Sequence, residues 1–180
     1  MAATVTRADG DARPEPVLSA ATTGGVLMPG SAVQEIIADV NAACRDLRAA
    51  ATAPGATMPA GTWSVAEVLG HIAFWLEAVV PVATYMLRGQ EIPPGNYFAS
   101  GYIPGDTWPN EDVHNAREAA WAAAQPFEAV IERFERAQQL VISTLATTIT
   151  DADIESNIGY YHSVAGHIRS HIVELSTATP

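Results

Sequence analysis

The sequence predicts an all-α protein, a four-helix bundle with one long connection between its second and third helices. Apolar residues recur at helical spacing in four long stretches, and no alternating strand pattern competes with them. Helix-start signals precede two of these stretches, and proline- and glycine-rich segments separate them. With 180 residues, 48% of them hydrophobic, the chain suffices for one domain with a sizeable core.

The first helix is expected after an N-terminal arm. Residues 1–30 lack hydrophobic periodicity, so we expect them to be flexible. A helix is predicted from Ser31 to about Ala53, with the Ser31 hydroxyl capping the first turn. Its apolar positions repeat at helical spacing and include Val33, Ile36, Ile37, Val40, Cys44 and Leu47.

The second helix has the clearest start signal in the chain. Ser64 and Glu67 form a capping-box pattern, and the helix is predicted to continue to about Arg88. Pro81 is expected to kink it. His71 lies within its apolar stripe, so this histidine is predicted to face the core.

A long connection and two further helices complete the predicted bundle. Residues 89–110 mix turn formers with aromatic residues, as a crossover or a lid over a site would. Helical spacing resumes over 111–146, where Pro126 should introduce a break or kink. The last helix is predicted over 160–175, and residues 177–180 form a C-terminal tail. On the third helix, the residues predicted to lie largely outside are Glu128, Glu132, Arg133, Glu135 and Arg136.

Three histidines are predicted to meet near one end of this bundle. His167 and His171 stand one turn apart, on one face of the last helix. If the long connection makes the second and third helices parallel, giving an up-down-down-up bundle, the second and fourth helices run in opposite directions. His71 and His171 then lie at the same level. Three imidazoles leave positions free for water or substrate, as in catalytic metal sites. The alternative is that core or surface histidines recur at helical spacing by chance.

Further residues are candidate neighbours of this cluster. Trp108, Asn110 and His114 would border it if the segment before Pro126 continued the line of the third helix. For His114 a position at the surface or at a helix start is favoured. His162 lies off the helical face of the His-x-x-x-His pair and is left outside the cluster.

Two carboxylates and a tryptophan lie close to the histidines in the sequence. Glu67, one turn before His71, could orient the imidazole or take a proton, and it is the one candidate for a catalytic role; completing the capping box is the favoured role. Glu174 could support His171 from outside the metal shell, although a solvated carboxylate at a helix end is favoured. Trp63 is interpreted as a core aromatic beside the helix cap.

Charge and cysteine content limit the classes of partner. Twenty acidic and nine basic residues give a net charge of −11, which opposes binding to nucleic acid or to an anionic membrane. The single cysteine, Cys44, falls on an apolar stripe and is predicted to be a buried thiol. Neither a secretory signal nor an uninterrupted transmembrane stretch is evident, so a cytoplasmic protein is expected.

The segment Trp63-Ser64-Val65-Ala66-Glu67-Val68-Leu69-Gly70-His71, followed by His167-Ile168-Arg169-Ser170-His171, resembles the DinB/YfiT-like metalloenzyme superfamily. The resemblance covers about residues 31–176 and implies a DinB-like four-helix bundle domain. It further implies that His71, His167 and His171 bind one divalent metal ion, with water or substrate completing the shell. A homodimer is also implied.

Two chemistries follow from the resemblance. One is an S-transferase or isomerase that uses a low-molecular-weight thiol such as bacillithiol, mycothiol or glutathione, and the other is a metal-dependent hydrolase. Because Cys44 is predicted to be buried, the first requires an external thiol. Zinc or nickel is expected, while iron, cobalt and manganese also accept imidazole. An alternative of another class is a non-catalytic bundle that binds a ligand or serves a stress response.

Overall fold

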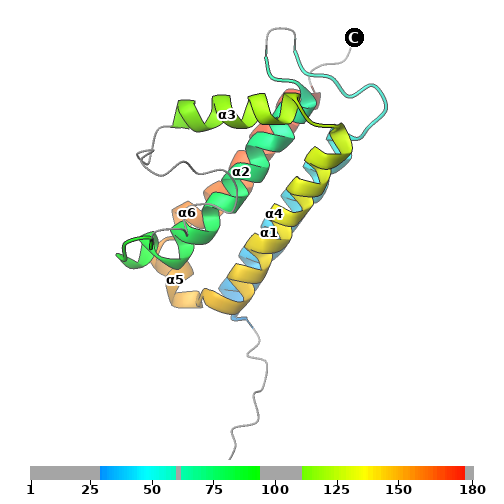
Figure 1. Ribbon diagram of the computed structural model, residues 1–180. Coiled ribbons are helices and arrows are strands. Elements are labelled where there is room, and N and C mark those ends of the chain that lie inside the picture. Colours follow the sequence, from blue (N-terminus) through cyan, green and yellow to red (C-terminus); the bar gives the residue numbers. More distant parts are fainter. Residues whose placement is uncertain (1–28, 60–61, 94–110, 177–180) are drawn as a thin grey trace, which may run out of the picture.

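The computed structural model describes residues 29–59, 62–93 and 111–176, which contain helices and no strand (Figure 1). The predicted all-α class is therefore confirmed for these residues. Most of the N-terminal arm, most of the predicted crossover and the C-terminal tail lie outside them. The elements are α1 (Ser31–Ala51), α2 (Val65–Thr84), the 3-10 helix η1 (Met86–Arg88), α3 (Glu111–Ala123), α4 (Phe127–Thr148), α5 (Asp151–Ser156) and α6 (Ile158–Ser176).

Four long helices pack around the core, and the site lies between two of them. Helix α2 packs mainly on α4 and α3, whereas α6 packs mainly on α1. In Figure 1, α1 and α6 run in one direction along the molecule, α2 and α4 run in the other, and α3 lies across one end. Helices α2 and α6 contact each other less closely than they contact these partners. The largest fully buried side chains are Tyr161, Phe74, Phe134, Ile36, Leu47, Leu69, Ile72, Leu76, Leu145, Ile154, Ile168 and His114.

The N-terminus of α1 is capped by a residue distant in sequence. The predicted cap, the Ser31 hydroxyl, is wrong, because Gly30 occupies the N-cap position and makes no side-chain bond. Instead, the backbone N–H of Val33 donates to Oδ1 of Asp151 at 3.0 Å. A Cβ atom at Gly30 would overlap the Asp151 carboxylate, so the absence of a side chain there allows this close approach.

Helix α2 begins as predicted. The Glu67 backbone N–H donates to Oγ of Ser64 at 3.3 Å, and the Ser64 N–H donates to Oε2 of Glu67 at 2.6 Å. The segment Val65–Arg88 is long and apolar enough to cross a membrane by composition alone. However, 72% of its most apolar window is buried inside the protein, as in a core helix.

The chain breaks at Pro126, as predicted, and the two flanking helices pack differently. Helix α3 ends at Ala123, and Pro126 is the N-cap of α4. Helix α3 is therefore a separate element that packs on α2. The two helices approach closely at Gly70, where a Cβ atom would lie 2.7 Å from Cβ of Ala122. The sequence analysis did not predict α5, which begins with a capping box between Thr150 and Asp153.

A buried ion network joins α2, α3 and α4. The prediction that Arg133 lies outside is wrong, because only 7% of this residue is exposed. Its guanidinium binds both oxygens of Glu77, at 3.1 and 2.9 Å, and Oε2 of Glu118 at 2.6 Å. It also lies 4.4 Å from the centre of the Trp121 ring. Helical periodicity alone could not predict this burial, because side chains from both α2 and α3 enclose the Arg133 guanidinium.

His114 also lies inside the protein, near the start of α3, so of the two favoured positions the helix start is confirmed and the surface is wrong. The residue is fully buried on α3. Its ring stacks on Phe74, with centroids 5.1 Å apart, and Arg117 donates to its Nδ1 at 2.9 Å. His114 therefore belongs to the packing between α2 and α3.

Candidate metal centre

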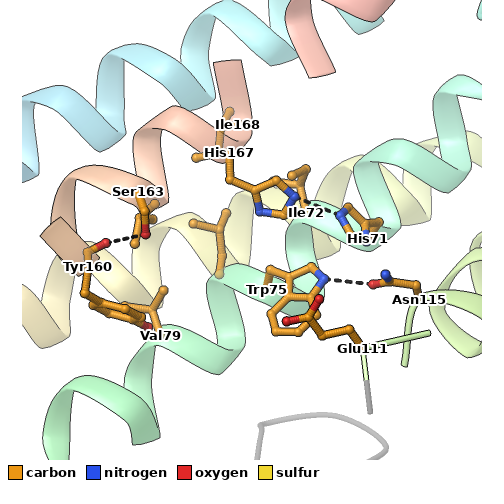
Figure 2. Close-up of a pocket in the computed structure, with 12 residues that line it drawn as sticks. His71, Ile72, Trp75, Val79, Glu111, Asn115, Tyr160, Ser163, His167 and Ile168 are labelled. Carbon is orange, nitrogen blue, oxygen red and sulfur yellow. Dashed lines mark hydrogen bonds between the residues drawn. The ribbon is translucent and has the colours of Figure 1, made fainter. Parts of the chain in front are cut away.

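The structure brings His71, His167 and His171 together from α2 and α6. Nε2 of His167 lies 3.0 Å from Nε2 of His71 and 3.3 Å from Nε2 of His171. The three candidate ligand nitrogens all lie within 4.8 Å of one another. Figure 2 shows the rings of His71 and His167 pointing toward each other across the gap between the two helices.

The surroundings favour neutral imidazoles. Burial, together with the neighbouring imidazoles of His167 and His171, lowers the pKa of His71 to about 3. Burial also lowers the pKa of His167, and His171 adds to this effect. Neutral imidazole is the form that binds a metal ion, so both rings are ready to do so at neutral pH.

The donor set fits a single ion. Ligand nitrogens about 2.1 Å from a tetrahedral ion are about 3.4 Å apart, close to two separations in the cluster. One hydrogen can bridge only one pair of nitrogens, so three converging Nε2 atoms cannot satisfy one another in neutral rings. A shared cation would satisfy all three. Imidazole is a suitable ligand for zinc, nickel, iron and copper, so three histidines do not determine which metal binds.

Glu174 supports the cluster from outside. Its Oε2 lies 2.8 Å from Nδ1 of His171, whereas a solvated carboxylate was the favoured expectation. In the neutral ring, Nδ1–H donates to this oxygen and the lone pair remains on Nε2, which faces the other imidazoles. Half of the Glu174 side chain is nevertheless exposed.

Trp63 covers one side of the cluster, and Glu67 caps its helix. The Trp63 ring centroid lies 4.7 Å from that of His71 and 6.5 Å from that of His171. The carboxylate of Glu67 accepts from the Ser64 backbone, so its favoured role as a cap is confirmed.

Of the other residues considered near the cluster in the sequence, the structure describes only some. His162 is exposed, outside the cluster as predicted. Trp108 and Asn110 lie outside the described residues. Two residues that the sequence analysis missed, Glu111 and Asn115, reach the site from α3. No signal in a single sequence shows which face of α3 contacts α2, so these residues could not have been found from periodicity.

A pocket of about 350 Å³ lies beside the cluster, between α2 and α6 (Figure 2). His71 and His167 line it, so a molecule in the pocket lies next to the candidate ligands. Nε1 of Trp75 donates to Oδ1 of Asn115 at 3.0 Å, which holds this amide at the pocket wall. The other lining residues are Ile72, Leu76, Val79, Glu111, Tyr160, Ser163, Val164 and Ile168.

Comparison with known proteins places the chain in a family. Neither the curated proteins nor the solved structures contain a significant match to it. The model of the DinB superfamily matches residues 2–171, a range that includes all three clustered histidines. The chain therefore belongs to the DinB superfamily.

Proposed function

We propose that this protein is a metal-dependent enzyme for a small molecule, with His71, His167 and His171 holding one divalent ion. The observation that carries the proposal is the convergence of three imidazole nitrogens, two of them from residues that line a pocket, His71 and His167. A divalent ion bound there lowers the pKa of a bound water or thiol and supplies a nucleophile at neutral pH. Zinc or nickel is the proposed ion.

Transfer of a low-molecular-weight thiol is the proposed reaction. In it, the thiol sulfur forms a bond to an electrophilic carbon, the leaving group departs with its bonding electrons, and the thiol proton passes to solvent. The thiol must be external, because Cys44 is fully buried and burial raises its pKa to about 12. Bacillithiol, mycothiol and glutathione are the candidates. Glu67 and Glu174 are engaged with a helix cap and with His171, and this favours a reaction that needs no additional carboxylate base.

Hydrolysis is the second candidate. Glu111 lines the same pocket as His71 and His167, where its carboxylate could take a proton from an attacking water. A non-catalytic binding protein is the third alternative, and the absence of turnover by the metal-loaded protein would favour it.

The first experiment measures metal per chain. Protein purified without a histidine tag or chelator is analysed as isolated and after incubation with zinc, nickel, iron, cobalt or manganese. About one ion per chain is expected from a single three-histidine site. His167→Ala should lose the ion. His162 is an exposed histidine on the same helix, so His162→Ala should keep it. No uptake of any metal would overturn the proposal.

The second experiment compares the two reactions. The metal-loaded protein is incubated with each thiol and an aryl chloride, and release of chloride is followed. Thiol-dependent release that disappears in His167→Ala supports transfer. Hydrolysis of simple esters without thiol, lost in Glu111→Gln, would support the second candidate instead.

Finer features of the fold and assembly are also proposed. We propose that residues 31–176 form one up-down-down-up four-helix bundle domain and that residues 89–110 form its crossover. We further propose a cytoplasmic homodimer. Light scattering after gel filtration tests the dimer, and a monomer at micromolar concentration would contradict it.

A further inference from the structure

The pocket beside the histidines has an apolar wall and one ionised side chain. Its wall between α2 and α6 is built from Ile72, Leu76, Val79, Val164 and Ile168. Apart from the histidines, Glu111 is the only acidic or basic amino acid among the described lining residues, which include no Lys or Arg. A carboxylate or phosphate entering this pocket would find a carboxylate and no side-chain cation.

The arginines of the described residues are held elsewhere. Arg88 binds Asp153, Arg133 binds Glu77 and Glu118, and Arg169 binds Asp39. Arg45, Arg48, Arg117 and Arg136 also pair with carboxylates outside the pocket lining. The chain has no lysine, and residues 94–110 contain no arginine. No long flexible cation from these parts of the chain is available to neutralise an anionic ligand.

We propose that the pocket selects molecules whose body, beyond the atom that binds the metal, is uncharged, and that Glu111 discriminates against carboxylate-bearing molecules. The inference rests on the proposed function: of its three candidate thiols, glutathione and bacillithiol carry carboxylates and are disfavoured, whereas mycothiol carries none. An anionic group placed against the apolar wall loses hydration and gains no ion pair with a lining Lys or Arg. Glu111 adds a direct repulsion, because it lines the same pocket.

The pocket is of small-molecule size: its volume of about 350 Å³ is near the lower end for such sites. Trp75 presents an aromatic ring at the centre of the lining residues (Figure 2).

Cobalt-loaded protein gives a direct test, because a thiolate bound to cobalt produces a charge-transfer absorption band. Two thiols of matched size are titrated: N-acetylcysteine amide, which is neutral, and N-acetylcysteine, which carries a carboxylate. With Kd expressed per thiolate, the neutral compound should bind about tenfold more tightly. Equal Kd values per thiolate would overturn the inference while leaving the metal site intact.

Glu111→Gln isolates the contribution of that carboxylate. The variant should reduce the ratio of the two Kd values about threefold. The effect is modest because Glu111 is exposed and its field is partly screened. Glu128→Gln is the matched control: it changes the net charge equally, is also exposed, and does not line the pocket. The control should leave the ratio of the two Kd values unchanged. An equal effect of both substitutions would show that net charge, and not Glu111, discriminates.

A second measurement needs no metal. Trp75 fluorescence, taken as the difference between the parent and Trp75→Phe, is quenched with neutral acrylamide and with anionic iodide. Relative to free tryptophan amide, iodide should quench less than acrylamide, and Glu111→Gln should raise iodide quenching selectively. Failure to take up cobalt or any other metal would therefore overturn the proposed function alone. Iodide quenching equal to that by acrylamide would overturn the charge selectivity.

Discussion

The Glu174 carboxylate lies 2.8 Å from Nδ1 of His171, where a metal-binding imidazole commonly has an acceptor. Removing this acceptor frees the ring to rotate and lowers the basicity of Nε2. We expect Glu174→Ala to weaken zinc binding about 10- to 100-fold. Competition against a chromophoric chelator measures the affinity. Glu155→Ala removes an exposed carboxylate from α5 and should leave the affinity unchanged; an equal loss in both variants would refute the positioning role.

Cys44 tests the burial of a single side chain. The thiol is fully buried, and burial raises its pKa to about 12. Only the thiolate reacts with aromatic disulfides, so the native protein should react slowly at mildly alkaline pH. Denaturant should release one fast-reacting thiol per chain, which matches the single cysteine of the sequence. Fast reaction in native conditions would contradict the burial.

The residues that were placed correctly from the sequence and those that were not differ in what determines their surroundings. His71, His167 and His171 lie on the apolar stripes of two helices, so their faces follow from spacing. His114 and Arg133 are buried by contacts among α2, α3 and α4, and nothing in the spacing of either helix encodes those contacts.

At the scale of elements, the ion network of Arg133, Glu77 and Glu118 holds α3 against α2 and α4. Arg133→Met would leave two buried carboxylates without their shared cation. Breaking such a buried network costs about 3–5 kcal/mol, so we expect a loss of that size in the free energy of unfolding. Denaturant titration followed by circular dichroism measures it.

Arg136 provides the matched control on the same helix. It lies one turn from Glu132, 3.6 Å away, and both side chains are about two-thirds exposed, at 66% and 69%. Exposed pairs contribute about 0–1 kcal/mol. Arg136→Met should therefore change stability little. Equal losses in the two variants would show that the buried network has no special role.

The contact between η1 and α5 predicts a pH dependence. The Arg88 guanidinium, which binds Asp153 at 2.8 Å, lowers the pKa of that carboxyl to about 2. Its folded pKa is thus below the unfolded value of 3.8. The stabilisation is present above that unfolded value and is lost as the pH falls toward 2. The melting temperatures of the parent and Asp153→Asn should differ at neutral pH and converge in acid; a constant difference would contradict this.

Element boundaries were predictable where local signals decide them. The capping box at Ser64 and the break at Pro126 are local chemistry, and both were predicted correctly. The cap of α1 comes instead from Asp151, more than a hundred residues away, and therefore could not be read from the Ser31 region. Helix α5 has only 6 residues, too few for hydrophobic periodicity to indicate a helix.

For the whole molecule, the histidine cluster was predictable because it depends only on helix direction and level. The pocket was not, because it depends on how far α2 and α6 diverge while each packs on another partner. The orientation of α3 decides which of its residues line the pocket. The segment that precedes α3 in the chain lies outside the described residues. The pocket therefore became visible only in three dimensions.

The net charge of −11 makes a final prediction for the whole molecule. Excess carboxylates repel one another more in the compact state than in the unfolded chain. Raising ionic strength shortens the Debye length from about 30 Å at 0.01 M to about 8 Å at 0.15 M, which screens this repulsion. Salt also weakens exposed pairs such as Arg48 with Glu135, but each contributes only about 0–1 kcal/mol. The melting temperature, measured by calorimetry, should therefore rise with sodium chloride, and it should rise less in a variant with several exposed carboxylates replaced by amides. A fall with salt would show that the paired charges outweigh the excess.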